Sequence, residues 1–151
     1  MRTYLVVIDG SPEAEKAMRF AARRAVKTAG NVEILALVPR PEFVQWGGVM
    51  ATMEEEARQR AEALVAGAAG TVLAESGLKP AITVRNGDGP KVIRDMITAN
   101  RDIAALVLGA AASGPPGPLV AHFAGVDAGA LHVPVIIVPG ALNMDEIDRL
   151  S

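Results

Sequence analysis

Residues 3–14 read T-Y-L-V-V-I-D-G-S-P-E-A, and this stretch decides the fold. Residues 4–8 are a short, unbroken apolar run rich in β-branched side chains, which is typical of a strand buried on both faces of a parallel sheet. Asp9 ends the run, and Ser11 and Pro12 follow as a suitable N-cap and first helical residue. The chain therefore passes from a core strand through a carboxylate to a helix N-terminus. Ligands of open α/β sheets sit at such strand ends, although Asp9 is equally interpretable as a turn or capping carboxylate.

The composition indicates one domain with an aliphatic core. The chain has 151 residues, of which 50% are hydrophobic and only 3% aromatic, and this length is that of one ordinary domain. The net charge of −2 argues against partners such as nucleic acid or a membrane surface. The absence of cysteine excludes a disulfide framework, a thiolate metal site and a cysteine nucleophile.

Neither a membrane span nor a signal peptide is apparent. The longest strongly apolar run, residues 103–112, is far shorter than the roughly 20 residues that cross a bilayer. The N-terminus enters a strand with no basic lead and no small-residue cleavage site. We therefore expect a cytoplasmic protein.

Apolar runs and helical patterns alternate along the rest of the chain. Strands are predicted over residues 4–8, 31–38, 80–85, 103–108 and 133–138. Helices are predicted from Pro12 to a C-terminal Gly30, from a capping box at Thr52 to about Ser76, after the turn at 86–90, and over residues 119–131. Residues 40–50 form the one long irregular stretch, interpreted either as a lid or interface or as a loop anchored by Trp46. Residues 141–151 form a polar tail with little to order it.

This alternation predicts an α/β fold: a single doubly wound five-stranded parallel sheet with helices on both faces and right-handed crossovers. We infer the strand order 3-2-1-4-5, the usual arrangement for five strands. Strands 1 and 4 are then neighbours, and Asp9 and Gly109 line one crevice.

A small-residue segment, here called the glycine loop (residues 109–118), follows the fourth strand. Its glycines would let the backbone approach an anion, and a helix N-terminus follows. An ordinary strand-to-helix connection has the same pattern. The segment is not a Walker loop, since it lacks G-K-[ST], and the dinucleotide fingerprint is absent after the first strand.

Catalysis has little support in the sequence. His122 and His132 have no serine, cysteine or metal-ligand partner at motif spacing, so we interpret them as surface or helix-end histidines. Glu54–Glu56 is interpreted as a cluster that complements the helix dipole. We expect no catalytic residue, no metal site and at most weak ATP hydrolysis.

Four motifs together resemble the universal stress protein family over about residues 1–140. They are V-I-D-G-S at 7–11, N-G-D-G-P at 86–90, the strand from Asp102 to Gly109, and P-V-I-I-V-P at 134–139. The resemblance implies a Rossmann-like, adenine nucleotide α-hydrolase-like fold, a homodimer and a role in stress resistance. It also implies a domain at 1–140 followed by the polar tail at 141–151.

Some members of that family bind ATP through a loop of the form G-x2-G-x9-G-[ST]. Gly109 matches the first glycine of this motif, but Ala112 stands where the second should be. If the count starts at Gly114 instead, Gly117 matches the second glycine, but Asp127 stands where the third should be. Two prolines also remove backbone donors from the loop. ATP, with Mg²⁺ only as its companion, is therefore one possibility, and a nucleotide-free dimeric scaffold is the alternative.

The candidate residues follow from this geometry. A bound nucleotide would place its base and ribose near the strand ends and its phosphates over the glycine loop. The nucleotide-binding candidates are Ile8, Asp9, Gly10, Ser11, Val38, Gly87, Gly109, Ser113, Gly114 and Gly117. The fifth strand is a short apolar edge that invites pairing with a second copy. The dimer-interface candidates are Val135, Ile136, Ile137 and Val138.

Overall fold

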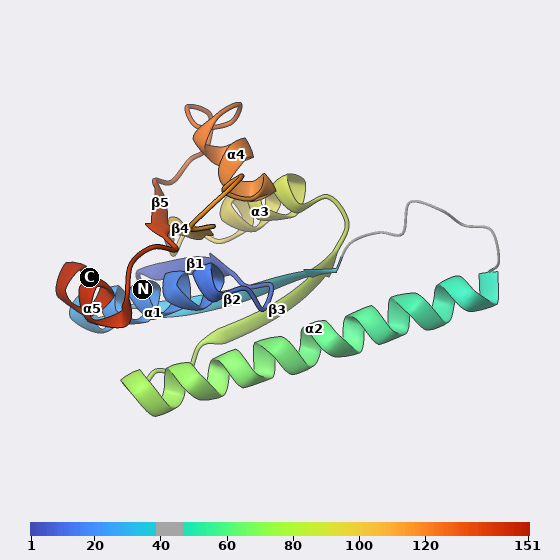
Figure 1. The fold of residues 1–151 in the computed structure, drawn as a ribbon, viewed down its shortest axis with the longest axis horizontal. Coiled ribbons are helices and arrows are strands. Elements are labelled where there is room, and N and C mark those ends of the chain that lie inside the picture. Colours follow the sequence, from blue (N-terminus) through green and yellow to red (C-terminus); the bar gives the residue numbers. More distant parts are fainter. Residues whose placement is uncertain (39–46) are drawn as a thin grey trace.

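The computed structural model describes residues 1–38 and 47–151, and side chains from Thr52 onward in the second of these ranges. Along the chain the elements are β1 (Thr3–Val7), α1 (Pro12–Lys27), β2 (Asn31–Val38), α2 (Gly47–Ser76), β3 (Ala81–Asn86), α3 (Gly89–Ala99), β4 (Ile103–Ala110), α4 (Pro118–Ala124), β5 (Val135–Pro139) and α5 (Met144–Leu150). The described strands form one sheet of order β3-β2-β1-β4-β5, and every pairing is parallel. The predicted fold class and strand order are confirmed (Figure 1).

The sheet lies between two helical layers. Tyr4, Val6 and Ile8 pack in one apolar cluster with residues of α1 and α2, whereas Leu5 and Val7 pack in a second cluster with α3 and α4. Alternate residues of one strand therefore serve opposite faces, as the pleat requires. This explains why the run at residues 4–8 is apolar throughout.

Helix α1 begins as the sequence predicts. The Ser11 hydroxyl accepts a hydrogen bond from the Ala14 N–H at 3.2 Å, and Pro12 occupies the first helical position. The predicted end of the helix at Gly30 is wrong in detail, because the left-handed residue is Ala29, with φ of 54°. Gly30 is required for a different reason: a Cβ there would lie 2.1 Å from the Arg2 carbonyl oxygen.

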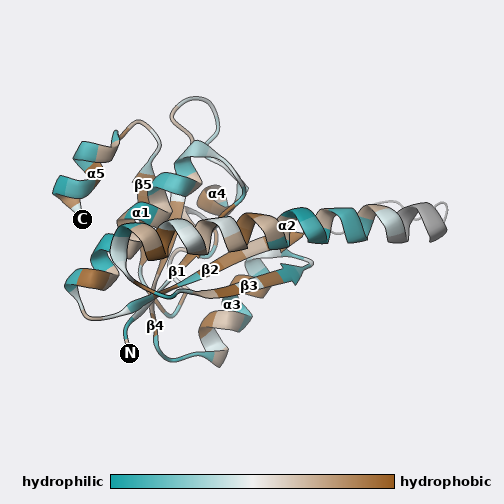
Figure 2. Cartoon of the chain, turned by 90° about the horizontal axis from the view of Figure 1, so that it is seen from below, coloured by the Kyte–Doolittle hydropathy of each residue, from teal (hydrophilic) through white to brown (hydrophobic). Residues whose placement is uncertain are grey.

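Helix α2 begins earlier than predicted. It starts at Gly47, so Thr52 lies inside the helix and the predicted capping box does not start it. The rest of the predicted irregular stretch, residues 40–46, lies outside the described residues. The buried α2 side chains are Ala61, Val65 and Val72. Residues 52–60 of α2, before these side chains, are mostly hydrophilic, and this part of the helix extends past the sheet (Figure 2).

Two boundaries near the glycine loop also differ from prediction. Strand β4 continues to Ala110, so Gly109 lies within a strand. Helix α4 ends at Ala124 instead of residue 131, because Gly125 takes the C-cap position with a non-helical backbone. The second glycine, Gly129, then lies in a turn.

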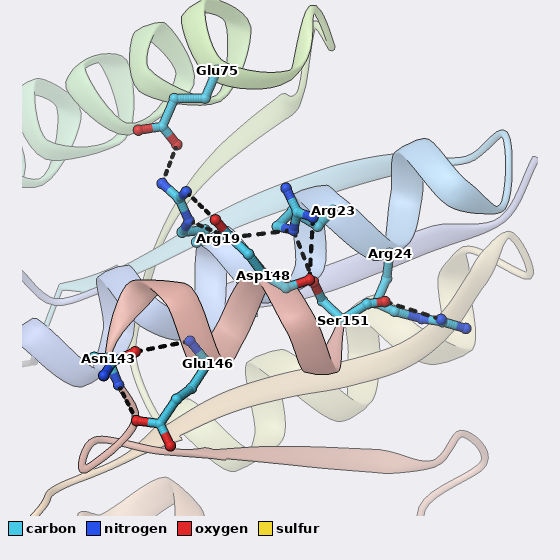
Figure 3. Close-up of polar contacts among 8 residues, drawn as sticks. All are labelled: Arg19, Arg23, Arg24, Glu75, Asn143, Glu146, Asp148 and Ser151. Carbon is cyan, nitrogen blue, oxygen red and sulfur yellow. Dashed lines mark hydrogen bonds and ion pairs between the residues drawn. The ribbon is translucent and has the colours of Figure 1, made fainter.

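The expectation that residues 141–151 have little to order them is wrong. They contain α5, which opens with a capping box between Asn143 and Glu146. Its Ile147 side chain is fully buried, and the helix packs on α1. Asp148 accepts two hydrogen bonds of 2.7 Å from the Arg19 guanidinium (Figure 3).

Candidate functional site

A small cleft opens where the carboxyl ends of β1 and β4 lie side by side. Its volume is about 100 Å³, and four of the predicted nucleotide-binding residues line it: Asp9, Ser11, Gly109 and Gly117. We call this the β1–β4 cleft. It lies at the switch point of the sheet, where chain connections leave in opposite directions.

The Asp9 carboxylate has a local structural role. Its Oδ1 atom accepts a hydrogen bond of 2.9 Å from the Ser11 N–H, which holds the turn between β1 and α1. The residue is nevertheless exposed and lines the cleft. The turn interpretation is therefore correct, and it leaves the carboxylate accessible to a ligand.

Gly109 is needed for the packing of α1. A Cβ at this position would lie 2.2 Å from the Glu13 carbonyl oxygen and 2.9 Å from the Ala14 nitrogen. Since real Cβ atoms do not approach backbone so closely, only glycine lets the start of α1 rest on β4. The close backbone approach that suggested a phosphate site is made here by the protein itself.

The glycine loop closes on itself after β4. The Ala111 N–H donates to the Pro116 carbonyl oxygen at 3.1 Å. Gly114 and Gly117 have φ of 72° and 116°, a backbone region that favours glycine. Gly117 is the N-cap residue of α4, without a side-chain cap.

The other predicted nucleotide-binding residues lie apart from the cleft. Ile8 and Gly10 line a larger groove between α1 and α2. Val38 and Gly87 meet at the ends of β2 and β3, where the Gly87 N–H donates to the Val38 carbonyl oxygen at 3.3 Å. Ser113 and Gly114 are exposed on the glycine loop.

Several cleft residues were not among the candidates. Glu13 and Ala14 come from the first turn of α1, and Pro116, Leu119 and Val120 come from the glycine loop and α4. The Ser11-Pro12 helix start could have indicated the first two, because the following turn faces the same edge as Asp9.

His122 has a partner that the sequence does not reveal. It lies in the last turn of α4, as a helix-end histidine, and its Nε2 atom is 2.7 Å from Asp127 Oδ2. Arg94 of α3 donates to the same oxygen at 2.6 Å. The hydrogen bond with His122 holds the pKa of the Asp127 carboxyl below its usual value, and Arg94 acts in the same direction. The trio ties α4 to α3 and lies outside the cleft.

The fifth strand forms one edge of the sheet. Val138 is buried, Val135 and Ile136 are half-buried, and Ile137 is 38% exposed. The four predicted interface residues therefore present one clearly outward side chain. Among the described residues no cluster of three potential metal ligands occurs, and no helix there is long and apolar enough to span a membrane.

Comparison with solved structures finds the same fold. Universal stress protein UspA from Lactobacillus plantarum superposes with a TM-score of 0.73 at 19% identity, covering 91% of this chain and 96% of that one. A universal stress protein family member from Burkholderia pseudomallei gives 0.71 at 15% identity, with 91% and 95% covered. The universal stress protein from Archaeoglobus fulgidus in complex with dAMP gives 0.60 at 18% identity, with 91% and 97% covered.

Sequence comparison identifies the family. Comparison with curated protein sequences gives no significant match. The family model described as the universal stress protein family, by contrast, matches residues 1–139. This range runs from the first strand to the end of the fifth. The chain therefore belongs to the universal stress protein family.

Proposed function

We propose that this protein is a nucleotide-responsive stress protein that binds an adenine nucleotide at the β1–β4 cleft. The observation that carries the proposal is the convergence of Asp9, Ser11, Gly109 and Gly117 on one cleft at the switch point of the sheet. The dAMP complex of the Archaeoglobus fulgidus relative supports the choice of ligand. The family match, which covers all five strands, supports the role in stress resistance.

Asp9 is the proposed anchor for the nucleoside. Its exposed carboxylate can accept hydrogen bonds from a ribose or an adenine amino group, and Ile8, Gly10, Ser11, Val38 and Gly87 would adjoin that part of the ligand. A charge-assisted hydrogen bond contributes about 1.5–3 kcal/mol. Removal of the carboxylate therefore weakens binding by about one to two powers of ten.

The phosphates would lie over the glycine loop. Pro115, Pro116 and Pro118 have no N–H, and the Ala111 N–H is bonded to Pro116. Gly109, Ser113, Gly114 and Gly117 remain as the proposed phosphate contacts. ATP would bring Mg²⁺ with it, because few protein groups here offset the phosphate charge. We propose no catalytic residue.

A nucleotide-free dimeric scaffold is the second candidate. Its support is the size of the β1–β4 cleft: about 100 Å³, whereas pockets for drug-sized ligands are about 300–1,000 Å³. A nucleotide would need the glycine loop to move outward. In either case we propose a cytoplasmic homodimer joined along β5.

Calorimetry with ATP, ADP and AMP decides between the two. We expect wild-type binding, with affinity reduced about ten- to a hundredfold in Asp9→Ala and less in Ser113→Ala, where backbone groups do most of the work. Asp9→Asn keeps an acceptor for the Ser11 N–H and tests the charge alone, and Glu54→Ala on the exposed part of α2 is the control.

Two results would contradict the nucleotide proposal. Wild-type binding that is insensitive to Asp9 would place the ligand elsewhere. No binding of any of the three nucleotides at millimolar concentration, with no adenine compound released on denaturing freshly purified protein, would favour the scaffold.

A further inference from the structure

A groove lies between α1 and α2, on the other side of Ala14 from the β1–β4 cleft. Its volume is about 430 Å³, which lies in the range of small-molecule sites. Ala14 and Met18 of α1 and Leu64, Gly67 and Ala68 of α2 line it. Small residues on α2 leave space that larger side chains would fill. We call it the α1–α2 groove.

The loop after β1 divides the two cavities. Asp9 and Ser11 line the β1–β4 cleft, whereas Ile8 and Gly10 line the α1–α2 groove. Successive residues of this loop thus face opposite sides. Ile8 and Gly10 are also proposed neighbours of the nucleoside, so the two sites adjoin, but no polar side chain lines both cavities.

The groove is elongated along α2. Its α2 wall runs from Ala63 to Glu75, a distance of about 18 Å at 1.5 Å per residue. Both helices follow parallel neighbouring strands, so they run in the same direction. Arg19 of α1 and Glu75 of α2 both line the groove, and their charged atoms lie 3.6 Å apart.

The charges around the groove favour a cation. Glu15 and Glu75 line it together with Arg19, the one cation among the described lining residues. The Arg19 guanidinium already donates to both carboxylate oxygens of Asp148 at 2.7 Å (Figure 3). An anionic ligand would therefore compete with Asp148. An amine would meet the exposed Glu15 carboxylate and would share with Arg19 the Glu75 carboxylate, whose side chain is 51% exposed and lies 3.6 Å from the Arg19 guanidinium.

We propose that the α1–α2 groove binds an elongated small molecule with an apolar body and one terminal amine. The apolar body lies along Met18, Leu64 and Ala68, and the amine pairs with Glu75 or Glu15. The proposal does not require nucleotide binding, because no polar side chain lines both cavities.

The test uses dansylcadaverine, a fluorescent aryl amine with an alkyl chain, titrated into the intact protein. Gly67 and Gly70 form a matched pair on α2: a Cβ at either one meets nothing within 4 Å, but only Gly67 lines the groove. Replacing a helical glycine also raises helix propensity, so both leucine variants should fold.

We expect Gly67→Leu to weaken dansylcadaverine binding at least about tenfold and Gly70→Leu to leave it within about twofold of wild type. Glu75→Gln should also weaken it, Asp9→Asn should not, and the carboxylate analogue dansyl-aminohexanoate should bind more weakly than the amine. Equal binding by the Gly67 and Gly70 variants, or equal affinity for amine and carboxylate probes, would overturn the proposal.

Discussion

Gly109 shows how the absence of one side chain sets the position of a helix. Because a Cβ there would lie 2.2 Å from the Glu13 carbonyl oxygen, Gly109→Ala must push α1 away from β4. We expect the free energy of unfolding to fall by about 1–3 kcal/mol, as for other overpacked sites, measured by urea denaturation. Gly70→Ala is the control and should raise stability by up to about 1 kcal/mol. A stable Gly109→Ala variant that has lost nucleotide binding would instead assign this glycine to ligand contact.

Single residues were predictable where their role is local. The Ser11 cap, Pro12 at the first helical position and the turn role of Asp9 all depend on neighbours a few residues away. Gly30 was recognised as special but for the wrong reason, and the packing role of Gly109 was not foreseen. Each is fixed by contact with a distant backbone segment, which no local pattern reveals.

Helix α5 depends on an ion pair that responds to acid. The hydrogen bond from Arg19 holds the pKa of Asp148 below its ordinary value of 3.8. The pair therefore stabilises the protein at pH values above the ordinary pKa of 3.8. This contribution to stability is lost as the pH falls through the lower pKa that Asp148 has in the folded state.

We expect Asp148→Asn to lower the urea midpoint of unfolding at neutral pH. The midpoint of the variant should fall less than that of the wild type as the pH is lowered, so that the two midpoints converge at low pH. Asp145→Asn, in the exposed first turn of the same helix, should change both much less. A difference between Asp148→Asn and wild type that persists unchanged at low pH would mean that packing, and not charge, couples Asp148 to α1.

Whole elements were predictable where the hydrophobic period agrees with the capping residues, glycines and prolines that mark the ends of an element. The sequence pattern predicted all five strands and four of the helices. It missed α5, because a charged segment of seven residues with one buried side chain, Ile147, shows no hydrophobic periodicity. The early end of α4 followed from Gly125, whose helix-breaking role was underestimated. The capping motif at Thr52 was misleading because the helix starts five residues earlier, at Gly47, although glycine is a poor helix former.

At the scale of the whole molecule, the proposed homodimer would extend the sheet across β5. Ile137 is the informative position, since it is 38% exposed, whereas Val138 is buried and its substitution would disturb the fold. We expect Ile137→Asp to be monomeric at micromolar concentration by light scattering. Ile82→Asp, at a 49% exposed position on the opposite edge strand β3, is the matched control and should remain dimeric.

A wild-type monomer would contradict the dimer outright, and a dimer that is lost only in Ile82→Asp would place the interface on β3.

The strand order itself was predictable, because alternation and crossover handedness leave few arrangements. The two cavities were not, since they arise from side-chain sizes on helices far apart in the sequence.

The strand order has a consequence for the chain while it is being made. β1 is synthesised first, yet its partner on one side is β4, which begins about 100 residues later. At about 5–20 residues per second, that edge stays open for roughly 5–20 s. During this interval the apolar strand β1 presents unpaired backbone groups on that edge. We therefore expect the incomplete chain to be prone to pairing with other strands, and slow expression to raise the yield of folded protein.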